Sequence, residues 1–216
     1  MIKVLIFDFD GLVFDTETYE LESYKLLYSR YETSFPLEQW LVSIGSKLHF
    51  NPYEKLITEQ PLLKLDDLRK ERMEIYKSII YNKSPRDGVV DYIEVARKHQ
   101  LQIAIASSSS KDWVMYHLNC IQLQNEFDCI YTADDVMEVK PSPELYQKVL
   151  KHYNILPSEA LAFEDSPNGS LAAIRAGIPC IVVPNEVTKN MEFDSRISGK
   201  INSMKEISLE NLVRKI

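Results

Sequence analysis

Hydrophobic residues follow two patterns near the N-terminus, a continuous apolar run and then helical spacing. The run Ile2–Phe7 contains one lysine and is otherwise apolar. Its length is that of a strand buried on both faces. The run ends abruptly at Asp8-Phe9-Asp10-Gly11. We therefore predict a buried β-strand that is followed directly by two acids and a glycine turn.

The segment from about Thr16 to Ser84 is rich in Tyr, Leu, Glu and Lys and has no strongly β-branched run. Apolar side chains recur in it at three- and four-residue intervals, as at Leu21, Tyr24 and Leu27. This spacing is typical of helices and predicts a small helical bundle. The helices are expected at Tyr19–Tyr31, Pro36–Ile44, Pro52–Thr58 and Leu65–Tyr81.

The remainder of the chain alternates between short apolar runs and helical patterns. The predicted strands are Leu101–Ala106, Cys129–Tyr131, Ala160–Phe163 and Pro179–Val183. The predicted helices are Val89–His99, Lys111–Leu118, Pro143–Tyr153, Ser170–Ala176 and Glu206–Arg214. Such alternation predicts a parallel sheet with helices on both faces. The expected fold class is α/β, with a Rossmann-like, doubly wound parallel sheet as core and a helical domain inserted after the first strand.

The change in pattern also places the domain boundaries. Residues 1–15 and 85–216 are expected to form the core domain, and residues 16–84 the inserted helical domain. The connections are expected at Phe14–Thr16 and at Ser84–Gly88, where a proline and a glycine interrupt the helical pattern.

The composition narrows the classes of function. The 216 residues carry a formal net charge of −7, which disfavours nucleic acids and membrane surfaces as partners because both attract basic patches. No apolar run reaches the length of a membrane span, and the N-terminus does not resemble a signal peptide. The three cysteines and four histidines lack the spacing of a zinc site. We expect a cytoplasmic protein with reduced thiols.

Polar side chains suited to phosphoryl chemistry follow four of the predicted strands. They are Asp8 with Asp10, Ser107 with Ser108, Lys140, and Glu164 with Asp165. In an extended chain Asp8 and Asp10 would stand side by side on one face. Parallel sheets bind ligands at the carboxyl ends of their strands. Carboxylates are the oxygen ligands that Mg²⁺ prefers, and hydroxyls and an ammonium offset phosphoryl charge. The set predicts a phosphoryl group bridged to Mg²⁺.

Each of these groups also has an ordinary structural interpretation when it is taken alone. Asp-x-Asp-Gly suits a solvated turn, the serine run suits a flexible loop, and Lys140 before a proline suits the surface. The stretch Glu164–Pro167 suits a helix N-terminus. The combination of all four, in this order and at strand ends, favours the phosphoryl site.

Four motifs resemble those of the haloacid dehalogenase-like superfamily. Asp8–Glu17 resembles the first motif almost residue for residue, and Ala106–Ser108 resembles the second. Lys140–Pro143 resembles the third and Phe163–Ser166 the fourth. The resemblance covers nearly the whole chain, and the helical insert falls where the family has a small mobile cap.

This resemblance implies a Mg²⁺-dependent phosphotransfer mechanism in which Asp8 attacks phosphorus and becomes an aspartyl-phosphate. Asp10 would protonate the leaving oxygen and then activate the hydrolytic water. Mg²⁺ would be held by the Asp8 carboxylate, the Asp10 backbone carbonyl and Asp165. Glu164 would be an additional ligand, or it would contact the ligands without binding the metal itself. The phosphoryl group would be bound by Ser107, Ser108 and Lys140.

Within the superfamily the chain is similar to the branch of β-phosphoglucomutases and small sugar- or glycolate-phosphate phosphatases. Mutases of this branch have a histidine where this chain has Glu20, and a lysine near Ile44–Ser46. A mutase must keep water from its phospho-aspartate, so these differences favour a phosphatase over a β-phosphoglucomutase-like isomerase. The expected partner is a small phosphorylated metabolite, and the expected state is a monomer or a weak dimer.

The resemblance also marks positions of the insert that would select the substrate. They are Glu17, Glu20, Gly45, Ser46 and Lys47. Solvated helix or loop charges are the competing interpretation of the two glutamates and the lysine.

A phospho-accepting signalling receiver is a further alternative, because it also combines an Asp pocket, a hydroxyl and a lysine on a parallel sheet. The insert and Asp10 argue against it, since a second aspartate mainly serves to turn the intermediate over. Dehalogenation would need neither Asp10 nor a metal. A glycosidase that used Asp8 and Asp10 would leave Ser107 and Lys140 unexplained.

Overall fold

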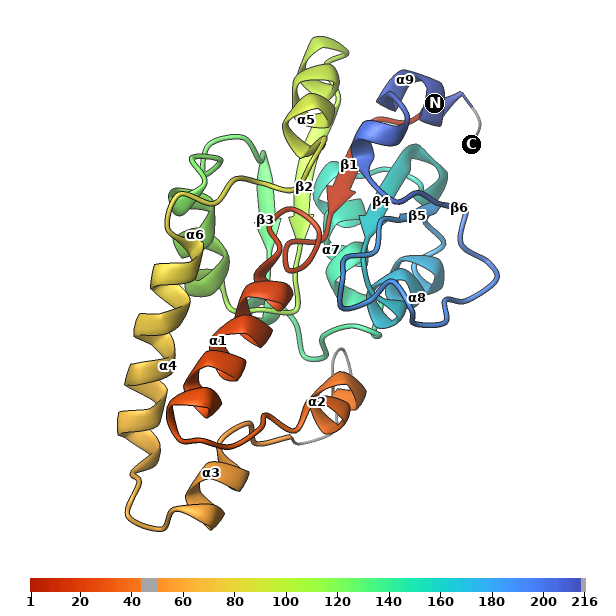
Figure 1. Cartoon of the computed structure of the whole chain (residues 1–216). Helices are drawn as coiled ribbons and strands as arrows, with labels where there is room; N and C mark the ends of the chain where they lie inside the picture. Colours follow the sequence, from red (N-terminus) through yellow and green to blue (C-terminus); the bar gives the residue numbers. More distant parts are fainter. Residues whose placement is uncertain (44–49, 215–216) are drawn as a thin grey trace. The chain divides into compact units, whose positions relative to one another are not determined.

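The computed structural model describes residues 1–43 and 50–214 and divides into two compact units (Figure 1). The core unit comprises Met1–Asp15 and Ser84–Ile216, and the helical unit comprises Thr16–Lys83. Among the described residues, no helix combines the length and apolar composition that a membrane span needs.

A six-stranded, fully parallel sheet forms the centre of the core unit. Its order is β3-β2-β1-β4-β5-β6, so that β1 (Val4–Phe7) lies between β2 (Gln102–Ala106) and β4 (Ala160–Glu164). The predicted α/β fold with a parallel sheet is thereby confirmed. The other strands are β3 (Cys129–Tyr131), β5 (Cys180–Val182) and β6 (Gly199–Lys200).

Both faces of the sheet are covered, which explains why its strands are continuously apolar. On one face Phe7 stacks on Phe163 with 5.1 Å between ring centroids, and Tyr92 of α5 (Val89–Lys98) packs edge-on against Phe163. On the other face Val4 and Ile6 share a buried cluster with α7 (Glu144–Tyr153) and α8 (Pro167–Arg175). The members from these helices are Leu145, Tyr146, Val149, Ala172 and Ala173.

The bounds of α8 and of the last described helix differ from the predicted bounds because side chains cap these helices. Helix α8 begins at Pro167 instead of Ser170, since the Ser166 hydroxyl accepts the Gly169 N–H and proline suits the first helical position. Helix α9 (Leu209–Val213) is shorter than predicted because Ser208 caps it, and a 3₁₀ turn precedes it. The remaining core elements are α6 (Lys111–Cys120) and 3₁₀ turns at Ala133–Asp135, Pro157–Glu159 and Met204–Glu206.

The helical unit has its own core, which is largely aromatic. Helix α1 (Thr16–Arg30) packs along α4 (Leu65–Ile80). Between them the buried Arg72 guanidinium lies over the rings of Tyr24 and Tyr76, at 5.0 and 5.4 Å from the ring centroids. Tyr24 also stacks on Phe35 at 5.3 Å. The shorter helices are α2 (Leu37–Ser43) and α3 (Glu54–Glu59).

Candidate functional site

The turn after β1 places two acids at the carboxyl edge of the sheet. The Asp8 N–H still pairs with the Phe163 carbonyl at 3.0 Å, as if the strand continued. The chain then reverses at Gly11, whose φ of 78° favours glycine, and the Gly11 N–H donates to the Phe14 carbonyl. The predicted glycine turn is confirmed.

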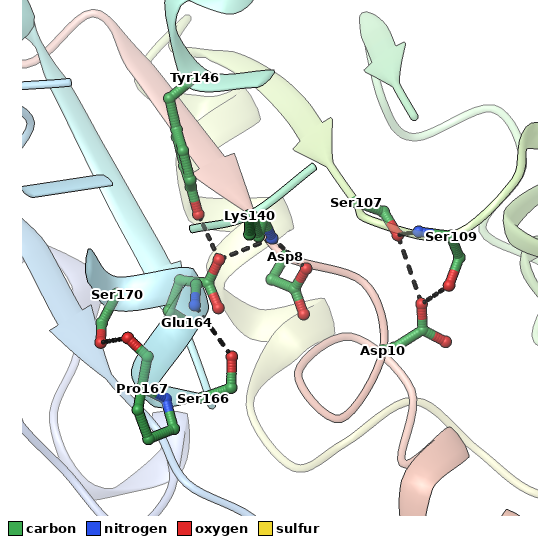
Figure 2. Close-up of polar contacts among 11 residues, drawn as sticks. Asp8, Asp10, Ser107, Ser109, Lys140, Tyr146, Glu164, Ser166, Pro167 and Ser170 are labelled. Atoms are coloured by element: carbon green, nitrogen blue, oxygen red, sulfur yellow. Dashed lines mark hydrogen bonds and ion pairs between the residues drawn. The ribbon is translucent and has the colours of Figure 1, made fainter. Parts of the chain in front are cut away.

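Lys140 joins two buried carboxylates beside this turn. Its Nζ atom forms ion pairs with Asp8 Oδ1 and with Glu164 Oε1, the latter at 2.6 Å (Figure 2). The Tyr146 hydroxyl donates to the same Glu164 oxygen. Lys140 is 9% exposed, Asp8 6% and Glu164 0%. Lys140 is therefore a buried partner of the acids rather than a surface lysine.

Burial and neighbouring charges together shift the pKa values of Lys140 and Asp8. Burial alone would lower the pKa of Lys140, but the carboxylates of Asp8 and Glu164 raise it above its usual value. Burial raises the pKa of Asp8 well above its usual range; Lys140 opposes this rise, while Glu164 and Asp10 add to it. Asp8, Glu164 and Lys140 thus form one buried, ion-paired group of two carboxyls and one ammonium.

Asp8, Glu164 and Asp165 form an acidic cluster whose side chains offer oxygen atoms within 4.8 Å of one another. A donor set made only of oxygen suits a hard divalent cation. The buried Glu164 Oε2 atom has no hydrogen-bond partner in the described part of the chain. Two glycines make room for these carboxylates, because an added Cβ would lie 1.9 Å from Glu164 Oε2 at Gly169 and 2.3 Å from Asp165 Oδ2 at Gly11. The cluster could hold a metal ion.

Two residues that the sequence did not mark support this cluster. The Asn185 side-chain amide donates to Asp165 Oδ2 at 2.8 Å. Arg86 donates to the carbonyls of Gly11 and Pro184 and so ties the turn after β1 to the loop after β5. Neither residue belongs to a motif, and only their contacts across distant loops reveal them.

The Asp10 side chain has a different set of partners. Its Oδ2 atom accepts hydrogen bonds from the Ser109 hydroxyl at 2.6 Å and the Ser107 hydroxyl at 3.3 Å (Figure 2). The Trp113 indole N–H donates to Oδ1 at 2.7 Å. The expectation that Asp8 and Asp10 stand side by side on an extended strand is wrong, because β1 ends at Phe7 and the chain turns. The two carboxylates instead bind different groups.

The serine loop after β2 only partly follows the prediction. Ser107 is fully buried, and its hydroxyl accepts the Ser109 N–H at 3.0 Å besides donating to Asp10. Ser108 is exposed. The run of serines signalled this loop but did not distinguish Ser109, and nothing in the sequence indicated Trp113. Phosphoryl binding by Ser107, Ser108 and Lys140 stays a prediction.

The structure describes two of the five positions proposed for substrate selection. Glu17 and Glu20 are on α1, and Glu20 is ion-paired with the buried Arg72 at 3.2 Å rather than simply solvated. Gly45, Ser46 and Lys47 lie outside the described residues. The metal role predicted for the Asp10 backbone carbonyl also stays a prediction.

Comparisons with known proteins agree over nearly the whole chain. The family model for haloacid dehalogenase-like hydrolases matches residues 5–183. YhcW of Bacillus subtilis, which is named as a phosphatase, is 44% identical over 215 residues, covering 99% of this chain and 97% of that protein. A phosphorylated carbohydrates phosphatase of Thermotoga maritima is 27% identical over 82% of each chain. The crystal structure of CbbY from Rhodobacter sphaeroides in complex with phosphate superposes with a TM-score of 0.77 at 25% identity, covering 99% of this chain and 100% of that one.

Proposed function

Because the chain belongs to the haloacid dehalogenase-like hydrolases, we propose that it is a Mg²⁺-dependent phosphatase that acts on a small phosphorylated metabolite. The family membership confirms the resemblance found in the motifs. The observation that carries the proposal is the pairing of buried Lys140 with Asp8 and Glu164 at the carboxyl edge of the sheet. Relatives named as phosphatases, one of them for phosphorylated carbohydrates, support the substrate class.

Asp8 is the proposed nucleophile. One of its carboxylate oxygens forms a bond to phosphorus while the bond from phosphorus to the leaving oxygen breaks. A carboxylate nucleophile divides a difficult displacement into two easier steps. Lys140 holds Asp8 Oδ1 and so orients the carboxylate. Its ammonium, together with the hydroxyls of Ser107 and Ser108, would stabilise the charge on the phosphoryl oxygens.

Asp10 is the proposed proton carrier in both steps. As a carboxylic acid it gives its proton to the leaving oxygen, and as a carboxylate it then takes a proton from water. The water oxygen bonds to phosphorus, the bond between phosphorus and Asp8 breaks, and inorganic phosphate leaves. A positioned acid–base group contributes about 10²–10⁴-fold to such reactions. Asp10 suits this role because it is hydrogen-bonded to Ser107, the proposed phosphoryl ligand.

The metal is assigned to the acidic cluster. Asp8, Glu164 and Asp165 would hold Mg²⁺ together with the backbone carbonyl of Asp10, and waters would fill the other positions. When bound, the cation would neutralise charge on the phosphoryl oxygens. Two observations support this assignment. All the donor atoms are oxygen, and Glu164 Oε2 has no hydrogen-bond partner among the described residues.

The helical domain of residues 16–84 is proposed as a cap that selects the substrate and excludes water when it closes. Its candidate selecting residues are Glu17, Glu20, Gly45, Ser46 and Lys47. The ion pair with Arg72 on α4 holds the Glu20 carboxylate in a defined position. A fixed carboxylate suits substrate selection better than a mobile one.

Phosphate release from a panel of sugar phosphates, phosphoglycolate and nucleotides tests this function. We expect Mg²⁺-dependent release from at least one small ester and its loss on chelation. Asp8→Asn keeps the size of the side chain and removes the nucleophile, so it should abolish turnover while circular dichroism shows an intact fold.

Two outcomes would contradict the proposal: no release from any ester by the wild type, or turnover retained in Asp8→Asn. Interconversion of glucose 1- and 6-phosphates with a bisphosphate primer, without net phosphate release, would favour the isomerase instead.

A further inference from the structure

Two residues outside the four motifs hold the Asp10 carboxylate, one on each oxygen. The Trp113 indole N–H donates to Oδ1 at 2.7 Å, and the Ser109 hydroxyl donates to Oδ2 at 2.6 Å. Because both oxygens have a donor, the rotation of the carboxyl group is restrained as well as its position. Hydrogen bonds of this kind to a charged group are shorter and stronger than neutral ones.

Trp113 is itself anchored. It lies in the first turn of α6, where its backbone N–H is capped by the Ser110 hydroxyl. The centroid of its ring lies 4.2 Å from that of the buried His117, one turn further along the helix. The Trp113 backbone carbonyl also contacts His117 Nδ1 at 2.8 Å. The rings of Phe9 and Phe14, on either side of the Gly11 turn, also pack near His117. The indole therefore reaches Asp10 from a packed helix.

The Trp113 indole and the Ser109 hydroxyl differ in whether they can also accept a hydrogen bond. An indole N–H can only donate a hydrogen bond, whereas a serine hydroxyl can donate or accept. Trp113 thus requires an acceptor at Oδ1 of Asp10, and a proton on that oxygen would weaken the contact. The partners of Oδ2, the hydroxyls of Ser109 and Ser107, can rotate to accept from a protonated oxygen.

We propose that Trp113 and Ser109 are positioning residues that orient Asp10 and direct its transferable proton to Oδ2. This inference rests on the proposed phosphatase function. In the first step the bond from phosphorus to the leaving oxygen breaks, and the leaving oxygen takes the proton from Oδ2. Asp10 is left as a carboxylate whose Oδ1 still accepts from Trp113. Water then returns a proton to Oδ2 as its oxygen bonds to phosphorus and the bond between phosphorus and Asp8 breaks.

The need for this proton depends on the leaving group. An alkoxide is strongly basic and cannot depart readily without it, whereas 2,4-dinitrophenolate is weakly basic and departs unaided. A variant that misorients Asp10 should therefore lose activity selectively on alkyl phosphates. A variant that merely disturbs the fold or the phosphoryl site should lose activity on both esters alike.

Trp113→Phe keeps an aromatic side chain, smaller than the indole, and removes the N–H donor. We expect kcat/KM to fall about tenfold or more for an alkyl phosphate that the wild type hydrolyses, and less than about twofold for 2,4-dinitrophenyl phosphate. Ser109→Ala should likewise lower kcat/KM for the alkyl phosphate more than for 2,4-dinitrophenyl phosphate. Ser109→Thr, which restores the hydroxyl, should bring the ratio of the two kcat/KM values back to the wild-type level. Equal losses on both esters, or no loss on either, would overturn the proposal.

Ser110→Ala is the matched control in the same loop. Ser110 contacts the backbone of Trp113 and caps α6, so its loss perturbs the helix end without removing a described donor to Asp10. We expect the ratio of the two kcat/KM values to stay at the wild-type level. A shift as large as that of Trp113→Phe would show that the effect arises from the helix and would overturn the role of the indole N–H.

A second measurement is independent of turnover. The chain has two tryptophans, Trp40 and Trp113, so a ¹⁵N spectrum has two indole N–H signals, and Trp113→Phe identifies one. In chelator, Asp10→Asn should move the Trp113 signal and leave that of Trp40 as the internal reference. An unmoved signal would overturn the hydrogen bond. Wild-type protein inactive on both esters would overturn the phosphatase function and the proton-transfer role, even if the signal moved.

Discussion

The acidic cluster depends on the room that small residues leave beside it as much as on charge. Gly11 and Gly177 share nearly the same left-handed backbone, with φ of 78° and 77°. Their surroundings differ, because a Cβ at Gly11 would lie 2.3 Å from Asp165 Oδ2, whereas a Cβ at Gly177 would lie 3.4 Å from Pro157 Cβ. The chain thus offers a matched pair of sites for separating backbone strain from a clash with the acids.

Gly11→Ala should destabilise the protein and disrupt the proposed metal site together. The backbone strain alone costs about 1–3 kcal/mol of unfolding free energy, and the clash must in addition displace Asp165. We expect Gly177→Ala to show only the strain in urea unfolding, while Gly11→Ala also loses Mg²⁺-dependent turnover. Comparable turnover in the two variants would mean that the Asp165 position does not depend on Gly11.

The residues that carry the proposed chemistry were partly visible in the sequence. Asp8 stood out because charge at the end of a buried apolar strand needs a partner. Lys140 and Glu164 stood out only in combination with it, and the structure pairs all three. Trp113 and Asn185 could not be found in this way. Their side chains are ordinary for a helix and a loop, and their contacts depend on how distant loops meet.

At the scale of elements, α6 couples a buried histidine to the turn that carries Asp10. His117 is fully buried, and its ring packs near Phe9, Phe14 and Trp113. Burial lowers the pKa of His117, although the Trp113 carbonyl and the Asp10 charge oppose the shift. Burial in this helix therefore favours the neutral form of the imidazole.

This packing predicts a loss of stability in mild acid. Histidine in an unfolded chain titrates near pH 6.5, about its ordinary pKa. Between the lowered folded pKa and that value the unfolded chain binds more protons, so the free energy of unfolding falls as the pH falls through this window. Urea unfolding at pH 7.5 and 5.5 should show a smaller difference for His117→Gln than for the wild type.

The exposed His152 provides the control for this comparison. His152→Gln should keep the wild-type dependence on pH. If His117→Gln kept it as well, another group would be responsible for the acid sensitivity.

Strands β1, β2 and β4 were predictable because burial on both faces makes each of them continuously apolar. The bounds of α8 and α9 were missed because Ser166 and Ser208 end the preceding loops with caps. Strand β6 was missed because Gly199–Lys200 has no apolar run. Only its pairing with β5 makes it a strand.

At the scale of the whole molecule, the chain combines a sheet that carries the proposed chemistry with a helical unit that has its own core. The sequence indicated the helical segment through its change of period, and the buried Tyr24, Tyr28 and Tyr76 bear out that pattern. The buried Arg72 was not anticipated, because a single arginine in a charged helix gives no signal. In the proposed function, we expect the choice of substrate to depend on residues of this helical unit more than on the sheet.

Trapping the phosphoryl group on Asp8 tests the central proposal most directly. Wild-type protein is mixed with Mg²⁺ and 2,4-dinitrophenyl phosphate, quenched in acid during turnover, and analysed by peptide mass spectrometry. We expect a transient phosphoryl group on the peptide that contains Asp8, none in Asp8→Asn, and accumulation in Asp10→Asn, which lacks the base for hydrolysis. Turnover without a phosphorylated Asp8 would contradict the mechanism, and a long-lived phospho-Asp8 in the wild type would instead favour a signalling receiver.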